Sequence, residues 1–423
     1  MIRFYNGFVL SMNGGTGVTC DEVWVEGDSI VYVGPEKTDM PKFEREIDLK
    51  GDVLMPGFKN AHAHSAMTFL RSYAEDMPLH EWLFSRVLPL EEKLTPEAVY
   101  AFTRLAILEY LTSGITASFD MYFYTDDYIS ASLDCGFRTV LCESLSAQPR
   151  NWDRVYDRYE RYNNTDPLIS YIMGFHAEYT ASEEMLRYAA EAARKLRVPV
   201  YSHNSETASE VKECIERNGL TPTAYFESFG MFEYGGGGFH CNYMTDEDLE
   251  IFKKHDMWVV TNPASNLKLA SGIAPITTML QKGINLAIGT DGSASNNALD
   301  MFREMYLVSV LQKYSCGDAS ACPADKVLEM ATVGGARAIG LADCDVIAEG
   351  KKADLIVIDM SRPNMQPVHS IPKNIVYSGS KENVRLTMIG GRVLYENGEF
   401  FVGESPERIY AEAEKYTRAI TEA

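Results

Sequence analysis

The sequence predicts an α/β fold: a (β/α)8 barrel of the TIM type with a small β-sandwich domain built from both chain ends. Three observations support this prediction. Short apolar strands alternate with amphipathic helical segments from residue 56 to residue 347, as in an α/β barrel of about 250 residues with insertions. Both ends of the chain instead show hairpin-like strands. Several central strands end in His or Asp, at the edge where such barrels place their sites.

The two chain ends share one pattern of apolar stretches separated by turn signals. The first 55 residues contain "IRFYNGFVLSM", "EVWVEGDSIVYVG" and "EREIDLKGDVLMPG", in which "EGDS" supplies a tight turn. The pattern returns in "GKKADLIVID" and "VRLTMIGGRVLYENGEF", where glycines and Asn397 mark turns. We therefore expect residues 1–55 and 348–423 to form one small β-sandwich domain, and residues 56–347 to form a metal-dependent catalytic barrel.

The central part shows helical periodicity followed by short apolar strands. In "PEAVYAFTRLAILEYLTSG", Val99, Phe102, Leu105 and Ala106 recur at helical spacing, and Gly114 stands where the helix should stop. The segments "SEEMLRYAAEAARKLR" and "ASEVKECIERNG" repeat this pattern, and the expected strands include "VPVYSH", "MWVVTN" and "INLAIGTD". The glycines of "EYGGGGFH" are interpreted as a flexible approach to a strand.

The composition excludes several classes of partner. The net charge of −21 would repel a phosphate backbone and an anionic membrane surface. No apolar run reaches about 18 residues, and the N-terminus lacks the pattern of a secretory leader. The eight cysteines are scattered without a C-x-x-C pair, which favours reduced thiols. We expect a soluble cytoplasmic protein with no nucleic-acid or membrane partner; its oligomeric state stays open, a homo-oligomer included.

The stretch "PGFKNAHAHS" places His62 and His64 two residues apart. On an extended strand both rings leave the same face and can reach one point. Alone, such a pair is more often two ordinary hydrogen-bonded or exposed histidines than half of a metal site. Further strands, however, end in His203, His240 and Asp291.

Three imidazoles and a carboxylate can hold one zinc-like ion and leave a position for water. The proposed ligands are His62, His64, His203 and Asp291. Such an ion lowers the pKa of its water toward about 7. Glu206 follows His203 by three residues, and it can act as a proton shuttle if the strand turns into a helix there. The alternative for Glu206 is an exposed carboxylate at a helix start.

His176, in "GFHAEYT", raises a competing motif. The H-x-E pattern opens the signature of a different deaminase class with cysteine-ligated zinc. That signature also requires P-C-x-x-C, which the sequence lacks. His176 is therefore predicted to be a substrate contact on a middle strand of the barrel.

Five segments together resemble the amidohydrolase superfamily, and more narrowly the 5′-methylthioadenosine/S-adenosylhomocysteine deaminases: "PGFKNAHAH", "SHNSET", "NPASNLKLASGIAP", "GTDGSASNNALDMF" and "GKKADLIVID". The resemblance spans nearly the whole chain. It implies one divalent ion per chain, zinc before others, on His62, His64, His203 and Asp291. It also implies catalytic roles for Glu206, His240 and Asp291, and substrate contacts by Trp82, Glu91, His176 and Ser295, with Glu91 on the ribose hydroxyls.

Two positions depart from the family pattern. Glu143 stands where relatives that grip a homocysteine carboxylate carry Arg, so we expect it to disfavour an anionic 5′ tail. Thr261 replaces a His before "NP".

The resemblance leaves several functions open. The first hypothesis is a metal-dependent deaminase of 6-aminopurine nucleosides: 5′-methylthioadenosine, S-adenosylhomocysteine or adenosine. The second is a related hydrolase of guanine, another aminopurine or pterin, or a chlorotriazine, because one fold hosts many chemistries. The third is an inactive barrel that serves as a binding or scaffold protein.

Overall fold

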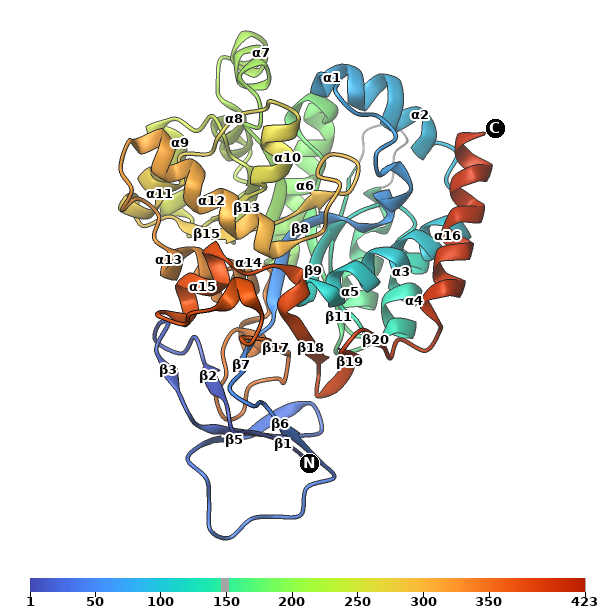
Figure 1. Ribbon diagram of the computed structural model, residues 1–423. Helices are drawn as coiled ribbons and strands as arrows, with labels where there is room; N and C mark the ends of the chain where they lie inside the picture. Colours follow the sequence, from blue (N-terminus) through green and yellow to red (C-terminus); the bar gives the residue numbers. More distant parts are fainter. Residues whose placement is uncertain (146–151, 423) are drawn as a thin grey trace.

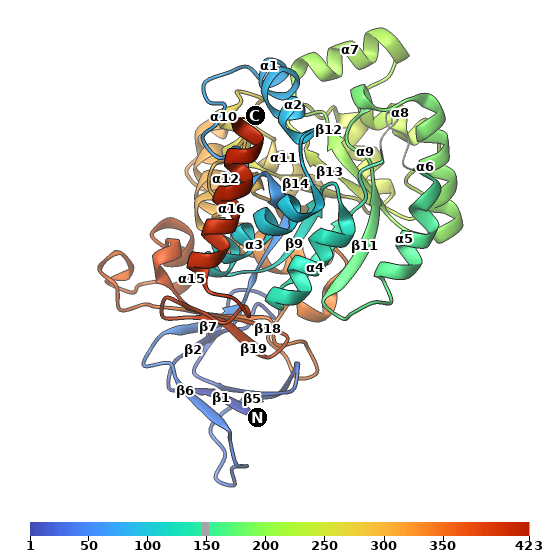
Figure 2. The ribbon, with the colours of Figure 1, turned by 90° about the vertical axis from the view of Figure 1, so that its right-hand side faces the viewer.

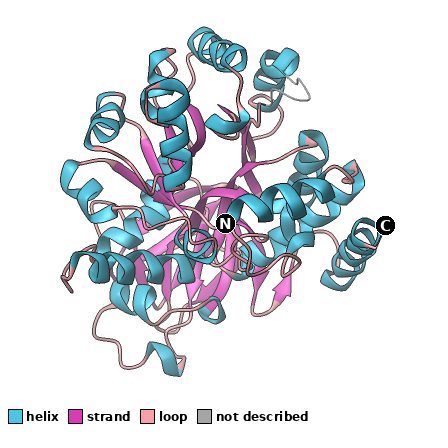
Figure 3. Cartoon of the chain, turned by 90° about the horizontal axis from the view of Figure 1, so that it is seen from above, coloured by secondary structure: helices cyan, strands magenta, loops and turns pink. Residues whose placement is uncertain are grey.

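The computed structural model describes residues 1–145 and 152–422, and its central feature is a barrel of parallel strands. In neighbour order these are β8 (Phe58–His64), β9 (Ile115–Met121), β10 (Arg138–Cys142), β11 (Ile169–Gly174), β12 (Val200–Asn204), β13 (Gly236–His240), β14 (Trp258–Thr261) and β15 (Asn285–Ile288), with β16 (Asp291–Gly292) beyond β8. Only two residues separate β15 from β16, and β16 pairs with β8, so the two are parts of one strand that closes the ring. Figure 3 shows the strands surrounded by helices. The predicted α/β barrel is confirmed.

The side chain of Asn60 helps to close the barrel between its first and last strands. Asn60 Nδ2 donates to Thr290 Oγ1 at 2.7 Å, and Thr290 N donates to Asn60 Oδ1 at 2.8 Å. A side-chain amide thus supplies one donor and one acceptor where β15 gives way to β16, as a backbone peptide group would. This pairing fixes the position at which Asp291 enters the barrel.

The helices lie outside the strands. They are α3 (Pro96–Thr112), α4 (Thr125–Cys135), α5 (Val155–Tyr162), α6 (Glu183–Leu196), α7 (Ala208–Asn218), α8 (Pro222–Ser228), α9 (Asp246–Lys254), α10 (Pro263–Lys268), α11 (Ile276–Lys282), α12 (Met301–Cys316), α13 (Ala324–Glu329) and α14 (Gly335–Ala338). The three helices expected from periodicity, α3, α6 and α7, start at side-chain caps on Thr95, Ser182 and Thr207. Gly114, just after α3, adopts φ +73°, as expected of a helix stop.

The glycine run before His240 is part of a strand, not a flexible approach to one. Gly236, Gly237 and Gly238 are buried residues of β13. A Cβ on Gly236 would lie 2.1 Å from the carbonyl oxygen of Val200, and one on Gly237 would lie 2.3 Å from the Tyr201 ring. Glycine is therefore required because β12 and the barrel interior approach closely here.

Two smaller sheets pack face to face below the barrel in Figure 1. One contains β5 (Ser29–Gly34), β4 (Glu22–Glu26), β1 (Ile2–Tyr5) and β6 (Arg45–Asp48), in this order. The other contains β20 (Glu399–Phe400), β19 (Arg392–Glu396), β18 (Val384–Ile389), β17 (Leu355–Ile358), β7 (Val53–Pro56), β2 (Phe8–Leu10) and β3 (Val18–Thr19). The sheets share an apolar core that includes Phe4, Val25 and Leu386. Because β7 lies between β2 and β17, both chain ends build this sandwich.

Two helices near the C-terminus pack on the barrel rather than on the sandwich. They are α15 (Ile371–Tyr377), which contacts α12 and α13, and α16 (Pro406–Thr421), which runs along α3 in Figure 2. Arg104 of α3 forms an ion pair with Glu412 of α16 at 3.3 Å. Domain boundaries at 55/56 and 347/348 remain a prediction. Among the described helices, none combines the length and apolarity needed to cross a bilayer.

Candidate active site

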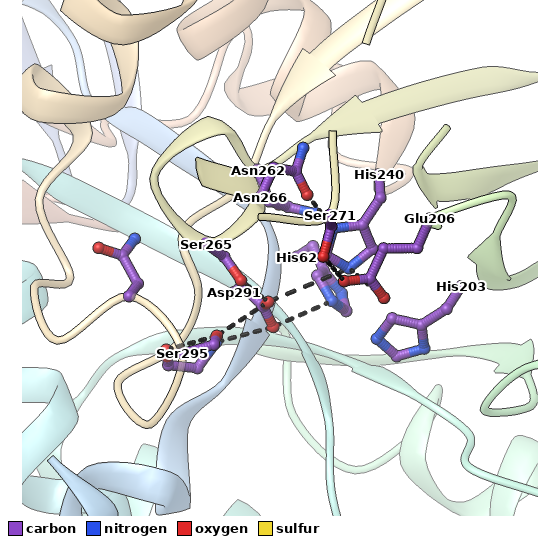
Figure 4. A network of polar contacts seen from close by, with 12 residues as sticks. His62, His203, Glu206, His240, Asn262, Ser265, Asn266, Ser271, Asp291 and Ser295 are labelled. Carbon is purple, nitrogen blue, oxygen red and sulfur yellow. Dashed lines mark hydrogen bonds and ion pairs between the residues drawn. The ribbon is translucent and has the colours of Figure 1, made fainter. Parts of the chain in front are cut away.

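Four strand ends bring imidazole and carboxylate groups to one point (Figure 4). His62 and His64 end β8, His203 lies in β12, His240 ends β13, and Asp291 begins β16. The potential ligand atoms of His62, His203, His240 and Asp291 all lie within 4.8 Å of one another. His64 Nε2 is 3.3 Å from Asp291 Oδ1. The structure therefore groups three of the predicted metal ligands, His62, His203 and Asp291, with His240, while the fourth predicted ligand, His64, adjoins this group through Asp291.

Hydrogen bonds set the orientation of three of the rings. Nδ1 of His64 lies 2.7 Å from the carbonyl oxygen of Met121, and Nδ1 of His203 lies 2.7 Å from that of His176. A carbonyl oxygen only accepts, so each Nδ1 carries the hydrogen and Nε2 keeps a lone pair. Nδ1 of His240 contacts Asn266 Oδ1 at 2.7 Å in the same way.

His62 is the buried, unpaired member of the group. Its ring stacks on Phe239 with a centroid distance of 3.8 Å, and the side chain is fully buried. Nε2 is 3.5 Å from Asp291 Oδ1, and neither ring nitrogen has a hydrogen-bond partner among the described residues. Buried polar atoms without a partner are rare because they cost free energy. A bound cation would satisfy one of these nitrogens, so the site fits a metal ion.

The electrostatics favour the protonation states that metal binding needs. Burial lowers the pKa of His62 to about 3 and lowers the pKa of His203, so both rings are neutral. Burial alone would raise the pKa of Asp291, but its contact with His62 and the nearby imidazoles bring this pKa below its usual value. Neutral imidazoles and an ionised carboxylate are the forms that bind cations. This nitrogen and oxygen donor set suits zinc-like ions.

Glu206 lies between the end of β12 and the start of α7, and its side chain is buried. Glu206 Oε2 is 3.8 Å from His240 Nε2, and Ser271 Oγ donates to Oε1 at 2.9 Å. The backbone N–H of Glu206 donates to Glu210 Oε2 at 2.7 Å, so Glu210 occupies the helix-start role instead. Glu206 is therefore not an exposed helix-start carboxylate, and it stands where a proton shuttle would be needed.

All four residues predicted to contact substrate line one cavity above this centre. Trp82 ends α1 (Leu79–Trp82) and Glu91 ends α2 (Leu88–Glu91), with the π-helical turn of residues 83–87 between them. His176 and Ser295 approach the same cavity from the barrel. Among the described residues, ten further lining residues were not predicted, and all but Ser144 are apolar or aromatic: Met67, Leu79, Leu83, Leu88, Met121, Tyr122, Phe123, Ser144, Tyr179 and Leu269. The cavity thus combines an apolar wall with a polar floor, as ligand sites commonly do.

Two of these contacts have defined partners. Glu91 accepts a hydrogen bond from Tyr122 Oη at 2.7 Å, and burial raises the pKa of its carboxyl group to about 7. Ser295 Oγ donates to Asp291 Oδ2 at 3.0 Å, beside Ser265 Oγ at 2.6 Å. Ser295 therefore orients the Asp291 carboxylate as well as lining the cavity.

Comparison with known proteins identifies the family. The model of the amidohydrolase family matches residues 53–394. The chain belongs to the amidohydrolase family. A protein of Pelotomaculum thermopropionicum named 5-methylthioadenosine/S-adenosylhomocysteine deaminase is 39% identical over 415 residues, covering 96% of each chain. A 5′-deoxyadenosine deaminase of Methanosarcina acetivorans is 38% identical, covering 96% of this chain and 95% of its own. The structure of an adenosine deaminase from Xanthomonas campestris with bound zinc has a TM-score of 0.95 at 33% identity, covering 100% of this chain and 99% of the other.

The competing H-x-E motif has a structural role in this amidohydrolase. Glu178 accepts hydrogen bonds from Arg217 at 2.5 Å and from Asn218 at 2.8 Å, both on α7. Glu178 is absent from the described lining of the cavity, whereas His176 belongs to it. The two residues of the motif therefore act in different places.

The expectation that Glu143 faces the 5′ end of a substrate is wrong. Its carboxylate accepts from Arg158 Nη1 at 2.9 and 3.0 Å and from Tyr171 Oη at 2.6 Å, within the layer between β11 and α5. Cys142, one residue earlier, faces the barrel interior, so strand alternation turns Glu143 away. Ser144, not Glu143, lines the cavity. Thr261 is buried in β14 and does not contribute to the described lining.

Sequence reasoning missed a group of amides and hydroxyls around the polar centre of this amidohydrolase: Asn242, Asn262, Ser265, Asn266 and Ser271. Four of them lie in "NPASNLKLASGIAP", which was quoted only as a family pattern. Its density of Asn and Ser directly after a barrel strand was the available signal, because polar residues at that edge face the site.

Proposed function

We propose that this protein is a metal-dependent hydrolase that deaminates 6-aminopurine nucleosides, releasing ammonia and an inosine-type product. One observation carries the proposal. His64, His203, His240 and Asp291 line one cavity together with Glu206 and Glu91, and the potential ligand atoms of His62 lie within 4.8 Å of those of His203, His240 and Asp291. Hydrolysis of an exocyclic amine requires a proton shuttle beside the reacting carbon, a role that Glu206 can fill. Binding of a ribose requires hydrogen-bond acceptors for its hydroxyls, a role that the buried Glu91 carboxylate can fill. Relatives named as deaminases of such nucleosides support the choice.

His62, His64, His203 and Asp291 would hold one divalent ion, with zinc as the first choice, and His240 borders it. The rings of His64 and His203 are fixed by main-chain carbonyls, which is the usual way in which ligand histidines are oriented. When bound, the ion supplies a water of lowered pKa that can attack at neutral pH.

The side chains around this water then move protons and stabilise charge. Glu206 takes a proton from the attacking water and gives it to the ring nitrogen N1 while the oxygen bonds to C6. His240 and Asp291 hold the new oxygen of the tetrahedral carbon. The hydroxyl proton passes through Glu206 to the amine, the C6–N bond breaks, and ammonia leaves. The product keeps the N1 proton and gains the C6 carbonyl, so atoms and charges balance.

The cavity wall selects the nucleoside. Trp82 and the apolar residues cover the purine and ribose, His176 contacts the ring, and Glu91 accepts hydrogen bonds from the ribose hydroxyls. A substrate without these hydroxyls leaves Glu91 with Tyr122 as its one side-chain donor among the described residues and its remaining acceptor capacity unmet, at a cost of about 1–3 kcal/mol.

The net charge of the chain and the state of its cysteines support the proposed compartment and partners. All eight cysteines are free, which is typical of a reducing compartment and supports a cytoplasmic location. The net charge of −21 opposes nucleic-acid and membrane partners. The proposed ligand is one small purine nucleoside, and a homo-oligomer is compatible with all of these features.

The direct test is ammonia release across a substrate panel: adenosine, 5′-methylthioadenosine, 5′-deoxyadenosine, S-adenosylhomocysteine, guanine and a pterin. Nucleosides with a 6-amino group should be hydrolysed, whereas guanine and the pterin should not. If guanine or the pterin is the best substrate and no nucleoside is hydrolysed, the proposal is wrong in its substrate class.

A further inference from the structure

Ser271 is held at the edge of the site by an unusual backbone turn. It follows α10, is 3% exposed, and donates its backbone N–H to the carbonyl of Asn266 at 2.8 Å. Its neighbours Ala270 and Gly272 have φ of 52° and 148°. A left-handed Ala costs free energy and persists only where the surroundings enforce it. The backbone therefore fixes where the Ser271 hydroxyl points.

That hydroxyl distinguishes the two oxygens of Glu206 (Figure 4). Ser271 Oγ donates to Glu206 Oε1 at 2.9 Å, and this is the hydroxyl's one hydrogen bond within the described residues. Glu206 Oε2 instead lies 3.8 Å from His240 Nε2, on the side where His240 groups with His62, His203 and Asp291. One oxygen is thus occupied by a donor, and the other faces the site.

The same segment also fixes His240. Asn266 Oδ1 accepts from His240 Nδ1 at 2.7 Å, and Asn266 Nδ2 donates to Asn242 Oδ1 at 2.9 Å. Asn242 Nδ2 then donates to the main-chain carbonyl of Glu206 at 2.9 Å. The relative placement of Glu206 and His240 therefore depends on α10 and the turn after it.

We propose that Ser271 is a positioning residue that confines the proton transfers of Glu206 to one oxygen, Oε2. A proton on Oε1 would point its hydrogen at the hydroxyl hydrogen of Ser271, which already donates to that oxygen. If the Ser271 hydroxyl rotated away, its hydrogen would have no acceptor among the described residues. A proton on Oε2 keeps this hydrogen bond, because Oε1 becomes the carbonyl oxygen that accepts it. Ser271 thereby also holds Oε2 toward the reacting atoms. This inference rests on the proposed deaminase function.

The test compares Ser271→Ala, Ser271→Thr, Glu206→Gln and the double variant with the wild-type protein. Ammonia release from adenosine gives kcat and KM, and elemental analysis gives the metal content. Ser271→Ala should lower kcat about 10- to 100-fold, as expected for loss of a hydrogen bond to a charged group. KM and metal content should stay near wild type. Ser271→Thr keeps the hydroxyl and should recover most of kcat.

The double variant separates a role through Glu206 from a general structural role. If Ser271 acts only through Glu206, adding Ser271→Ala to Glu206→Gln should cause no further loss of kcat. Ser118→Ala is the matched control: Ser118 is buried in β9, its hydroxyl has no hydrogen-bond partner among the described residues, and its removal should leave kcat unchanged.

Three results would overturn the role of Ser271: a kcat of Ser271→Ala within twofold of wild type, losses that add fully in the double variant, or a threonine variant as impaired as the alanine variant. Absence of wild-type activity on every 6-aminopurine nucleoside would instead reject the proposed function. The positioning role would then be judged by crystal structures, in which the Glu206 carboxylate should rotate in Ser271→Ala and stay in place in Ser271→Thr. An unmoved carboxylate in both would reject it.

Discussion

Asp291 shows at the scale of one residue how the site is assembled. Its Oδ2 accepts from the hydroxyls of Ser265 and Ser295, while its Oδ1 faces the imidazoles of His62 and His64. Oδ1 also accepts from the backbone N–H of Gly292 at 2.8 Å, so three neutral donors stabilise the ionised carboxylate. The residue also adopts φ of 62°, which is uncommon outside glycine. A strained backbone at this position is maintained by the surrounding contacts.

Glu91 carries the residue-scale prediction. In Glu91→Gln the acceptor pair for the ribose hydroxyls is reduced to one neutral oxygen, so adenosine should lose its advantage over 2′,3′-dideoxyadenosine. We expect the ratio of their kcat/KM values to fall about 10- to 100-fold, with metal content unchanged. Glu92→Gln is the matched control, since Glu92 is the next residue and is exposed. An unchanged ratio in Glu91→Gln would show that Glu91 does not bind the ribose.

Single residues were predictable where one rule determined their position. The spacing of His62 and His64 and the strand ends at His203 and Asp291 follow from a period of two and from the polarity of barrel edges. Ser271 could not be predicted, because its place depends on the left-handed turn at Ala270. Glu143 was placed wrongly because the sequence does not show which face of β10 points inward; the structure shows Cys142 facing inward, and strand alternation then turns Glu143 outward.

At the scale of elements, an ion cluster ties the segment before α1 to two loops of the barrel. Lys268 Nζ, at the end of α10, lies 2.5 Å from Glu75 Oε2 and also contacts Asn297 Oδ1. Asn297 Nδ2 donates to Glu75 Oε1 at 2.8 Å. Glu75 lies shortly before the helices that carry Trp82 and Glu91. The cluster therefore fixes the base of the cavity wall.

We expect Lys268→Met to loosen this wall. KM for a nucleoside should rise about 3- to 10-fold, the effect of roughly 1 kcal/mol from a partly buried ion pair, while the metal is retained. Steady-state kinetics measures this. Lys326→Met provides the comparison, because Lys326 forms an exposed pair with Glu329 at 2.8 Å on α13. Equal KM values for the two variants would contradict the role given to the cluster.

Elements were predictable to different degrees. The helices α3, α6 and α7 have apolar stripes, caps and stops that agree with one another, so periodicity located them. The strand ending at His240 was expected, but its glycines were interpreted as a flexible approach because they lack the apolar side chains that mark strands; their necessity comes from contact with β12. The helix α16 was missed because the hairpin pattern was extended to the chain end.

At the scale of the whole molecule, the sandwich and the barrel are joined through continuous chain and a buried ion pair. β7 of the sandwich passes into β8 of the barrel with only Gly57 between them, and Gly57 N donates to the carbonyl of Asp354 at 2.9 Å. Arg138 of β10 forms a two-point contact with Asp354 at 2.7 and 3.0 Å. This joint lies at the end of β8 opposite to the histidines, so the sandwich contacts the barrel at the end away from the candidate active site.

Lys59 is buried at this end of the barrel, and its burial leads to a prediction about how stability depends on pH. Its Nζ contacts Thr116 Oγ1 at 2.7 Å and the carbonyl of Gly57 at 3.0 Å, and burial lowers its pKa. The unfolded chain therefore binds this proton more readily, and stability rises with pH between the lowered pKa and the ordinary value of about 10.4. Each pKa unit corresponds to about 1.4 kcal/mol. Replacement by an uncharged side chain removes this dependence.

We therefore expect Lys59→Met to increase the free energy of unfolding, relative to wild type, more at pH 7 than at pH 10. Urea denaturation at both pH values measures the difference. Lys50→Met, at an exposed position, should show no such pH dependence. A Lys59→Met effect that is the same at pH 7 and pH 10 would show that the buried amine does not change its protonation on unfolding in this range.

The central claim, a deaminase that works with one divalent ion at the histidine–aspartate centre, is tested most directly by metal titration. Zinc is removed by chelation, added back in known equivalents, and ammonia release from adenosine or 5′-methylthioadenosine is measured after each addition. We predict no activity without metal, a linear rise, and saturation at one equivalent per chain. Full activity in protein shown by elemental analysis to be metal-free, or no activity on either nucleoside after one equivalent of zinc is bound, would contradict the claim.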